Sequence, residues 1–175
     1  MPFFTVGHSD RTIEAFHEAL QTAGVESLVD VRKLPGSRSN PQFDEDVLAP
    51  SLKSAGIRYR HEPALGGLRG RSKTVPPEVN GLWRNRSFHN YADYATGDEF
   101  ADALARLRAE GSERATVVMC SEAVWWRCHR RIIADHLLAL GEDVRHIMAE
   151  GRIDRATLTP GAFVHADGQV TYPPV

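Results

Sequence analysis

The sequence is poor in cysteine and has no long apolar run, and each shortage excludes a class of protein. Its 175 residues contain two cysteines, Cys120 and Cys128, which excludes a disulfide-rich secreted scaffold. No run of 18 apolar residues occurs, so no helical membrane span is expected. The opening MPFFTVGHSD has no basic region before an apolar stretch, which predicts no signal peptide. We therefore expect a cytoplasmic protein that has no membrane partner.

The chain also lacks a strong excess of charge of either sign. It has 21 basic and 23 acidic residues, and its formal net charge is −2. A protein with this balance has no global electrostatic footprint for nucleic acid, so any basic surface must be local. The 42% hydrophobic fraction is ordinary for a globular protein, and the length fits one domain over residues 1–175.

Short runs of β-forming residues alternate with segments of helical periodicity through most of the chain. We predict a three-layer α/β domain with a mostly parallel, Rossmann-like sheet and a C-terminal hairpin turning at Asp167-Gly168. Residues 64–96 are expected to be irregular. The predicted strands are 3–6, 25–32, 57–63, 115–120 and 143–148. The predicted helices begin at Thr12, at Pro50, near Phe100 and after Cys120, and they end at Gly24, Gly56, Gly111 and Gly141.

Polar residues follow the carboxyl end of every predicted parallel strand. In an open α/β sheet the ligand crevice lies outside these ends, so the residues there are candidates for a common site. We predict that Gly7, Asp30, His61, Cys120 and His146 lie along one edge of the sheet. Asp30 and Arg32 alternatively form a structural ion pair. His17 and His136, inside predicted helices, are expected at the surface.

Five motifs together resemble the domain-of-unknown-function 488 family. They are TVGHSDRTIEAF, LVDVRKLPGSRSNPQF, GIRYRHEPALGG, VVMCSEAVWWRCHRR and VRHIM, and they span Thr5 to about Met148. The resemblance implies an α/β fold and a shared polar site, without an agreed reaction. The positions that carry it are His8, Ser9, Asp30, Arg32, Arg38, Cys120, Glu122, Cys128, His129 and Arg130.

The inventory of residues permits a carboxylate mechanism on an anionic substrate. Chemistry at a glycosidic bond of a nucleotide or nucleic-acid base needs a carboxylate and phosphate anchors. We therefore predict an enzyme acting on such a substrate, with an anionic small molecule or nucleic acid as partner. The predicted catalytic residues are Cys120, Glu122, Asp30 and His8, and the predicted binding residues are Ser9, Arg32, Arg38, His61 and Arg130. Ser9, Arg32 and Arg38 are expected to form an anion site near the helix that begins at Thr12.

Two alternatives use the sulfur atoms. In a sulfur-transfer or redox enzyme, nearby arginines and a helix N-terminus activate Cys120, and Cys128 serves as resolving partner. A zinc site would use Cys120, Cys128 and His129, with or without Glu122 as a further ligand. Adjacent residues on a helix point to different faces, however, and paired Cys-x-x-Cys units are absent. The expectation is a site without metal or cofactor, in which Cys120, Glu122 and Arg130 face the cleft and Cys128 packs beneath the loop.

A third alternative is a non-catalytic nucleic-acid-binding module. The segment 66–91 carries five basic residues against one acid, with aromatic residues between them. Such a mixture can follow a phosphate backbone and stack bases. The segment can equally be a solvated loop that Trp83 pins to the core.

Overall fold

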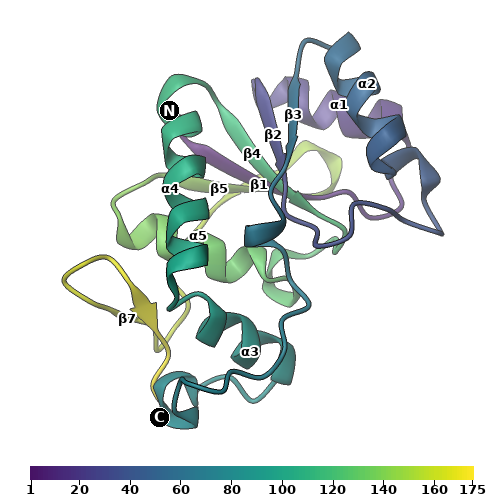
Figure 1. Cartoon of the computed structure of the whole chain (residues 1–175). Helices are drawn as coiled ribbons and strands as arrows, with labels where there is room; N and C mark the ends of the chain where they lie inside the picture. The colour runs from purple at the N-terminus through teal and green to yellow at the C-terminus, as the bar shows by residue number, and fades with distance from the viewer.

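The computed structural model describes all residues, 1–175, and its centre is a six-stranded sheet in the order β3-β2-β4-β1-β5-β6 (Figure 1). The first five strands are parallel, and β6 pairs with β5 in the antiparallel sense. The strands are β1 (Phe3–Gly7), β2 (Ser27–Asp30), β3 (Arg58–His61), β4 (Thr116–Cys120), β5 (Val144–Ile147) and β6 (Ile153–Arg155). The predicted α/β fold is confirmed, and β6 was missed.

Helices cover both faces of the sheet. They are α1 (Ile13–Thr22), α2 (Glu45–Ser54), α3 (Arg86–Tyr94), α4 (Asp98–Glu113) and α5 (Arg130–Ala139). Five short 3-10 turns join them: η1 (Pro41–Phe43), η2 (Pro63–Leu65), η3 (Pro77–Asn80), η4 (Trp125–Arg127) and η5 (Ala149–Gly151). No helix is long and apolar enough to cross a bilayer.

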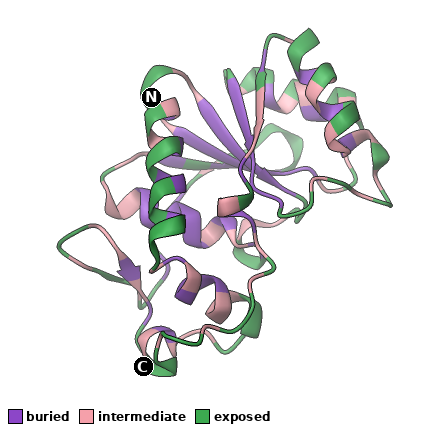
Figure 2. Ribbon diagram, in the orientation of Figure 1, coloured by how far each residue is buried: buried purple, intermediate pink, exposed green.

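Each central strand contributes alternate side chains to two separate cores. In β4, Val117 and Met119 pack with α1 and α2, whereas Val118 and Cys120 join the core formed with α3, α4 and α5. Because both faces are covered, the central strands are buried throughout and read as nearly continuous apolar runs (Figure 2). Cys120 therefore points to the side of the sheet on which α3 and α5 lie.

The connections place a topological switch point at the carboxyl end of β4. The chain leaves β1 and β2 for α1 and α2 on one face, whereas it leaves β4 for α5 on the other. β4 lies between β1 and β2 in the sheet. The loop that follows β4 therefore runs away from the loops that follow these two neighbouring strands. Crevices that bind ligands in open α/β sheets form at such points.

Three local predictions were wrong. Pro50 lies inside α2, which begins five residues earlier, where Glu45 and Asp46 supply the acidic first turn that favours a helix N-terminus. Gly111 does not end α4 but lies within it, where a Cβ atom would overlap the ring of Phe3. The segment predicted to be irregular contains α3, which Asn85 caps by accepting hydrogen bonds from two backbone N–H groups.

The C-terminal hairpin is confirmed. It pairs β7 (Phe163–Val164) with β8 (Val170–Thr171) in a separate two-stranded sheet, and Gly168 takes the positive φ of 86° that the turn requires. Tyr172, just beyond the hairpin, is buried and donates a hydrogen bond to Asp135 of α5 at 2.7 Å. The end of the chain is thus fastened to the face of the sheet that carries α5.

Candidate functional site at the carboxyl end of β4

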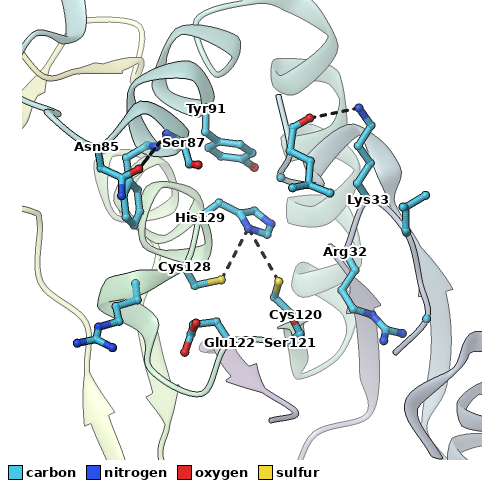
Figure 3. Close-up of a pocket in the computed structure, with 16 residues that line it drawn as sticks. Arg32, Lys33, Asn85, Ser87, Tyr91, Cys120, Ser121, Glu122, Cys128 and His129 are labelled. Atoms are coloured by element: carbon cyan, nitrogen blue, oxygen red, sulfur yellow. Dashed lines mark hydrogen bonds between the residues drawn. The ribbon is translucent and has the colours of Figure 1, made fainter. Parts of the chain in front are cut away.

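A cavity of about 370 Å³, here called the thiol cleft, lies outside the carboxyl ends of β2 and β4 (Figure 3). Four segments line it: the loop after β2, the loop after η2, the N-terminal part of α3, and the turn after β4. Its lining residues are Arg32, Lys33, Leu34, Gly36, Gly67, Leu68, Asn85, Ser87, Phe88, Tyr91, Cys120–Glu122 and Arg127–His129. The predicted sheet edge is confirmed, because Gly7 pairs with Cys120 and Asp30 with His61 at the ends of their strands, and His146 is the last residue but one of β5.

Both cysteine sulfurs lie against one imidazole nitrogen. His129 Nδ1 is 3.9 Å from Cys120 Sγ and 3.7 Å from Cys128 Sγ, as the dashed lines in Figure 3 show. The three atoms lie within 4.8 Å of one another. On the opposite side of the ring, His129 Nε2 donates a hydrogen bond to the carbonyl of Val31 at 2.8 Å. This bond places a proton on Nε2, so in the neutral ring the lone pair of Nδ1 faces the sulfurs.

The local backbone explains why adjacent residues converge here. The η4 turn follows the loop after β4, Cys128 is extended at φ −126° and ψ 147°, and His129 is only the N-cap of α5. Cys128 therefore does not lie on a helix. For this reason its side chain and that of His129 do not point to different helix faces, contrary to our prediction. His129 rather than Arg130 faces the cleft, which corrects the prediction, and Cys128 lines the cleft although it is buried.

Arg130 has a structural position beneath the turn. Its side chain is 1% exposed, and Nη1 donates a hydrogen bond to the backbone carbonyl of Glu122 at 2.8 Å. Gly7 is what makes room for this contact, because a Cβ atom there would lie 2.6 Å from Nη1 and would overlap the Glu122 carbonyl. Arg130 holds the loop that presents Cys120 and Glu122, instead of binding a ligand in the cleft.

The two thiols differ in acidity. A hydrogen bond from Cys128, aided by His129 and opposed by burial, lowers the pKa of Cys120 well below its usual value. Burial and the hydrogen bond to Cys120 raise the pKa of Cys128 well above its usual value. Glu122 lines the same cleft, is exposed and has no ion-pair partner. The edge thus combines a thiol of lowered pKa, an imidazole and an unpaired carboxylate.

Asp30, which we predicted to be catalytic, instead has a structural role. Arg32 binds it through two side-chain bonds, Nε to Oδ1 at 2.9 Å and Nη2 to Oδ2 at 2.7 Å, and through its backbone N–H. Tyr59 donates a further hydrogen bond to Asp30 at 2.6 Å, and Arg32 also donates to the carbonyl of Phe43. Asp30 is fully buried and does not line the thiol cleft.

The other predicted residues lie around the cleft rather than in it. His8 is buried and stacked on Phe43 at 4.3 Å, and burial lowers its pKa. His61 donates a hydrogen bond to the Arg32 carbonyl at 2.6 Å. Arg38 is exposed in a separate hollow among Asp44, Glu45 and Asp46, and Ser9 hydrogen-bonds to Asp10. Ser9, Arg32 and Arg38 therefore do not form the expected anion site.

Much of the basic-aromatic segment packs against the core. Arg69 stacks over Tyr94 at 3.8 Å and donates to two backbone carbonyls. Trp83 stacks on Phe88 at 4.8 Å, and Tyr91 is buried and donates a hydrogen bond to the Leu65 carbonyl. These contacts hold α3 in place, and Tyr91 lies against the His129 ring at 5.0 Å.

The remaining cations of this segment line a second hollow, here called the basic groove, on the other side of α3. Its volume is about 840 Å³, and it contains Arg71, Lys73, Arg84, Arg86 and His89. None of the four arginine and lysine side chains forms an ion pair. Asp93, the acid that lines the groove, accepts from Asn80 and faces His89.

Several residues that line the cleft were not predicted from the sequence. Lys33 of the β2 loop, and Asn85, Ser87, Phe88 and Tyr91 of the α3 wall, were not assigned to this site. The signal for α3 was Asn85 followed by apolar residues at helical spacing, hidden among arginines and asparagines. His136 was also misplaced, since it is 3% exposed and packs its ring edge against Phe100.

Comparison with known proteins gives a family without a described reaction. No curated protein and no solved structure matches the chain. The model of the family described as "Domain of unknown function DUF488" matches residues 12–137, which include all of α1 to α4 and most of α5. The two cysteines, the paired imidazole and the Asp30–Arg32 pair all fall inside this match. The chain therefore belongs to the DUF488 family.

Proposed function

We propose that the protein is an enzyme acting on a nucleotide or on a base of a nucleic acid, with Cys120 and Glu122 as the reactive edge of the thiol cleft. One observation carries this proposal: the cleft and the basic groove share α3 as a common wall. Within α3, Ser87, Phe88 and Tyr91 line the cleft, whereas Arg86 and His89 line the groove. A ligand that reaches around α3 would meet reactive groups at one end and free cations at the other.

The charges of the groove favour phosphates. Its four unpaired cations occupy one hollow, and such an arrangement gains affinity by releasing counterions from a polyanion. In the cleft, Lys33 and Arg127 add positive charge, and Phe88 offers an aromatic face. The anion anchors of this proposal are therefore groove residues, in place of Arg32, Arg38 and Arg130.

Glu122 is the residue assigned to proton transfer. It is exposed to the cleft and unpaired, so its carboxylate is free to take a proton from a water molecule or from the substrate. General-base catalysis contributes about 10²–10⁴-fold to a rate. Glu122→Gln keeps the shape of the side chain and removes this capacity.

Binding tests the substrate class. Titration of a fluorescent single-stranded oligonucleotide at several salt concentrations should give a slope of about −3 in log K against log salt if four phosphates are contacted. The double variant Arg84→Gln/Arg86→Gln should reduce the slope by about 1.4. Arg58→Gln, an exposed change at the start of β3, is the matched control and should leave the slope unchanged. Absence of binding at low salt would refute the substrate class.

Mass spectrometry of nucleosides and oligonucleotides incubated with the protein tests catalysis. A product that disappears with Cys120→Ala and with Glu122→Gln supports the enzyme. Binding that persists in both variants, with no product formed by the parent protein, would identify a non-catalytic binding module instead.

A thiol-dependent sulfur-transfer or redox enzyme is the second candidate. The observation that favours it is the approach of both sulfurs to His129 Nδ1, within 3.9 Å. Such an enzyme would cycle between dithiol and disulfide and would lose activity with Cys128→Ser. Intact-protein mass measured after mild oxidation distinguishes the candidates, because a disulfide lowers the mass by two hydrogens.

A further inference from the structure

We propose that Cys120, Cys128 and His129 bind one zinc ion, with the fourth coordination position open to the thiol cleft. The site concerns the same cleft as the proposed function, and its role in catalysis rests on that function. Its binding of metal does not, since the three donor atoms and their surroundings define it without reference to any substrate.

The spacing of the donors fits a tetrahedral ion. Zinc binds thiolate sulfur at about 2.3 Å and imidazole nitrogen at about 2.0–2.1 Å, so tetrahedral geometry places sulfur and nitrogen about 3.6 Å apart. The two sulfur–nitrogen distances are 3.9 and 3.7 Å. The group as a whole spans 4.8 Å, whereas two thiolates on a tetrahedral zinc lie about 3.8 Å apart, so the sulfurs need to approach each other by no more than about 1 Å.

The surroundings of His129 prepare Nδ1 as a ligand. The Nε2–H group donates to the Val31 carbonyl at 2.8 Å, the outer hydrogen bond that ligating histidines usually make. Tyr91 and Gly67 both pack close to the ring: the Tyr91 ring lies 5.0 Å away, and a Cβ atom at Gly67 would come within 3.1 Å of Nδ1. The imidazole is therefore already oriented for metal.

Cys128 Sγ is held in position by a backbone contact. The backbone N–H of Arg130 donates to Cys128 Sγ at 3.5 Å, a contact that favours a thiolate. Both cysteines are almost fully buried, yet both line the cleft. Sites with three protein ligands and one open position are typical of catalytic zinc, whereas structural sites have four protein ligands.

Glu122 lies outside the ligand set. It lines the same cleft, but its carboxylate is not part of the group of three donors. This leaves it free to exchange protons with whatever occupies the open position. Zinc and an adjacent carboxylate would give the cleft hydrolytic chemistry, with a water molecule as the natural fourth ligand.

Metal binding by the 175-residue chain tests the inference without a substrate. Elemental analysis after dialysis against zinc should give about one zinc per chain. Cobalt added to metal-free protein should produce visible bands of tetrahedral intensity and a thiolate-to-cobalt charge-transfer band. Cys120→Ser, Cys128→Ser and His129→Gln should each lower zinc affinity by more than about 100-fold, beyond the 10–100-fold cost of losing an outer hydrogen bond.

His61→Gln is the matched control, because His61 stands at a neighbouring strand end and is not part of the cluster. It should retain full zinc binding. Circular dichroism of each metal-free variant separates loss of ligands from loss of fold. The zinc proposal would be refuted if the folded parent protein showed no cobalt charge-transfer band, or if a Cys120–Cys128 disulfide persisted in a reducing buffer. Oligonucleotide binding through the basic groove is measured separately, so failure of either proposal is recognisable by itself.

Discussion

The ends of β2 and β4 lie side by side in the sheet, yet they use polar residues in opposite ways. At the end of β2, Asp30 is fully buried, and Arg32 and Tyr59 saturate its oxygens with hydrogen bonds. At the end of β4, Cys120 and Glu122 line an open cavity, and Glu122 has no charged partner. A polar residue at a strand end therefore does not by itself indicate a site. A site is distinguished by polar groups that have no partner within the fold.

Breaking the β2 end should produce the largest effect on stability. Asp30→Asn keeps the volume of the side chain but leaves Arg32 as an uncompensated buried cation. Removal of one partner from a buried pair costs about 3–5 kcal/mol of unfolding free energy. Urea denaturation measures the loss, and Glu122→Gln at the β4 end should change stability by less than about 0.5 kcal/mol. Equal costs for the two variants would remove the contrast between the strand ends.

His136 provides a third case, a buried imidazole beside a separate hollow, with one ring nitrogen that has no hydrogen-bond partner. It is 3% exposed, its Nε2 has no hydrogen-bond partner, and burial lowers its pKa to about 4. The unfolded chain takes up a proton near pH 6.5, whereas the folded chain does so only near pH 4. Stability is therefore present above pH 6.5 and falls as the pH decreases toward 4, by about 3 kcal/mol from this group.

His136→Leu should remove that part of the acid sensitivity. Urea denaturation of both proteins at pH 7 and at pH 4.5 gives the difference, which cancels the contribution of carboxylates and of His146. A variant with the same acid sensitivity as the parent would show that His136 is solvated in the folded state.

The layout of the sheet was predictable from the sequence. Which polar residues at its edge stabilise the fold, and which line the cleft, was not predictable. Apolar strands with polar ends follow from burial on both faces, which is why the placement of the five strand-end residues along one edge was confirmed. Whether Asp30 is free or paired depends on Tyr59 and Phe43, which are remote in sequence. Likewise, the preference for Arg130 over His129 followed from placing both residues on the helix predicted after Cys120, whereas η4 delays the start of α5 until Arg130.

The polar segment before α4 was the hardest to interpret. Its arginines and asparagines conceal the helical spacing of Phe88, Tyr91 and Ala92, so the wall of the cleft was taken for a loop. Local composition describes the exposed side of such a helix, whereas its buried side is visible only after the sheet has placed Leu65 and His129 against it. The residues that shape the cleft are thus set by contacts across 26 or more positions.

Gly7, at the end of β1, packs against the loop after β4, and its substitution should show a smaller effect than that of Asp30. A Cβ atom at this position would overlap the Glu122 carbonyl and crowd Arg130 Nη1. Gly7→Ala should cost about 1–3 kcal/mol, as overpacking in a filled interior does, and it should displace the loop that carries Glu122. Gly70→Ala is the matched control, since a Cβ atom there meets nothing within 4 Å. An unchanged rate of Cys120 alkylation in a destabilised Gly7→Ala protein would show that the loop and the thiol are independent.

The smallest effect is expected from substitution of Arg38. This arginine is an example of a cation that neither stabilises the fold nor binds the ligand. Its side chain is exposed among Asp44, Glu45 and Asp46, whose negative charges would repel a phosphate. Arg38→Gln should therefore change stability by less than about 0.5 kcal/mol and leave oligonucleotide affinity unaltered. Arg86→Gln, an equally exposed change in the basic groove, should weaken the same oligonucleotide and reduce the salt slope by about 0.7. If both variants weakened binding equally, the anion would be held by diffuse charge over the surface, and α3 would lose its assigned role as the wall between the phosphates and the reactive edge.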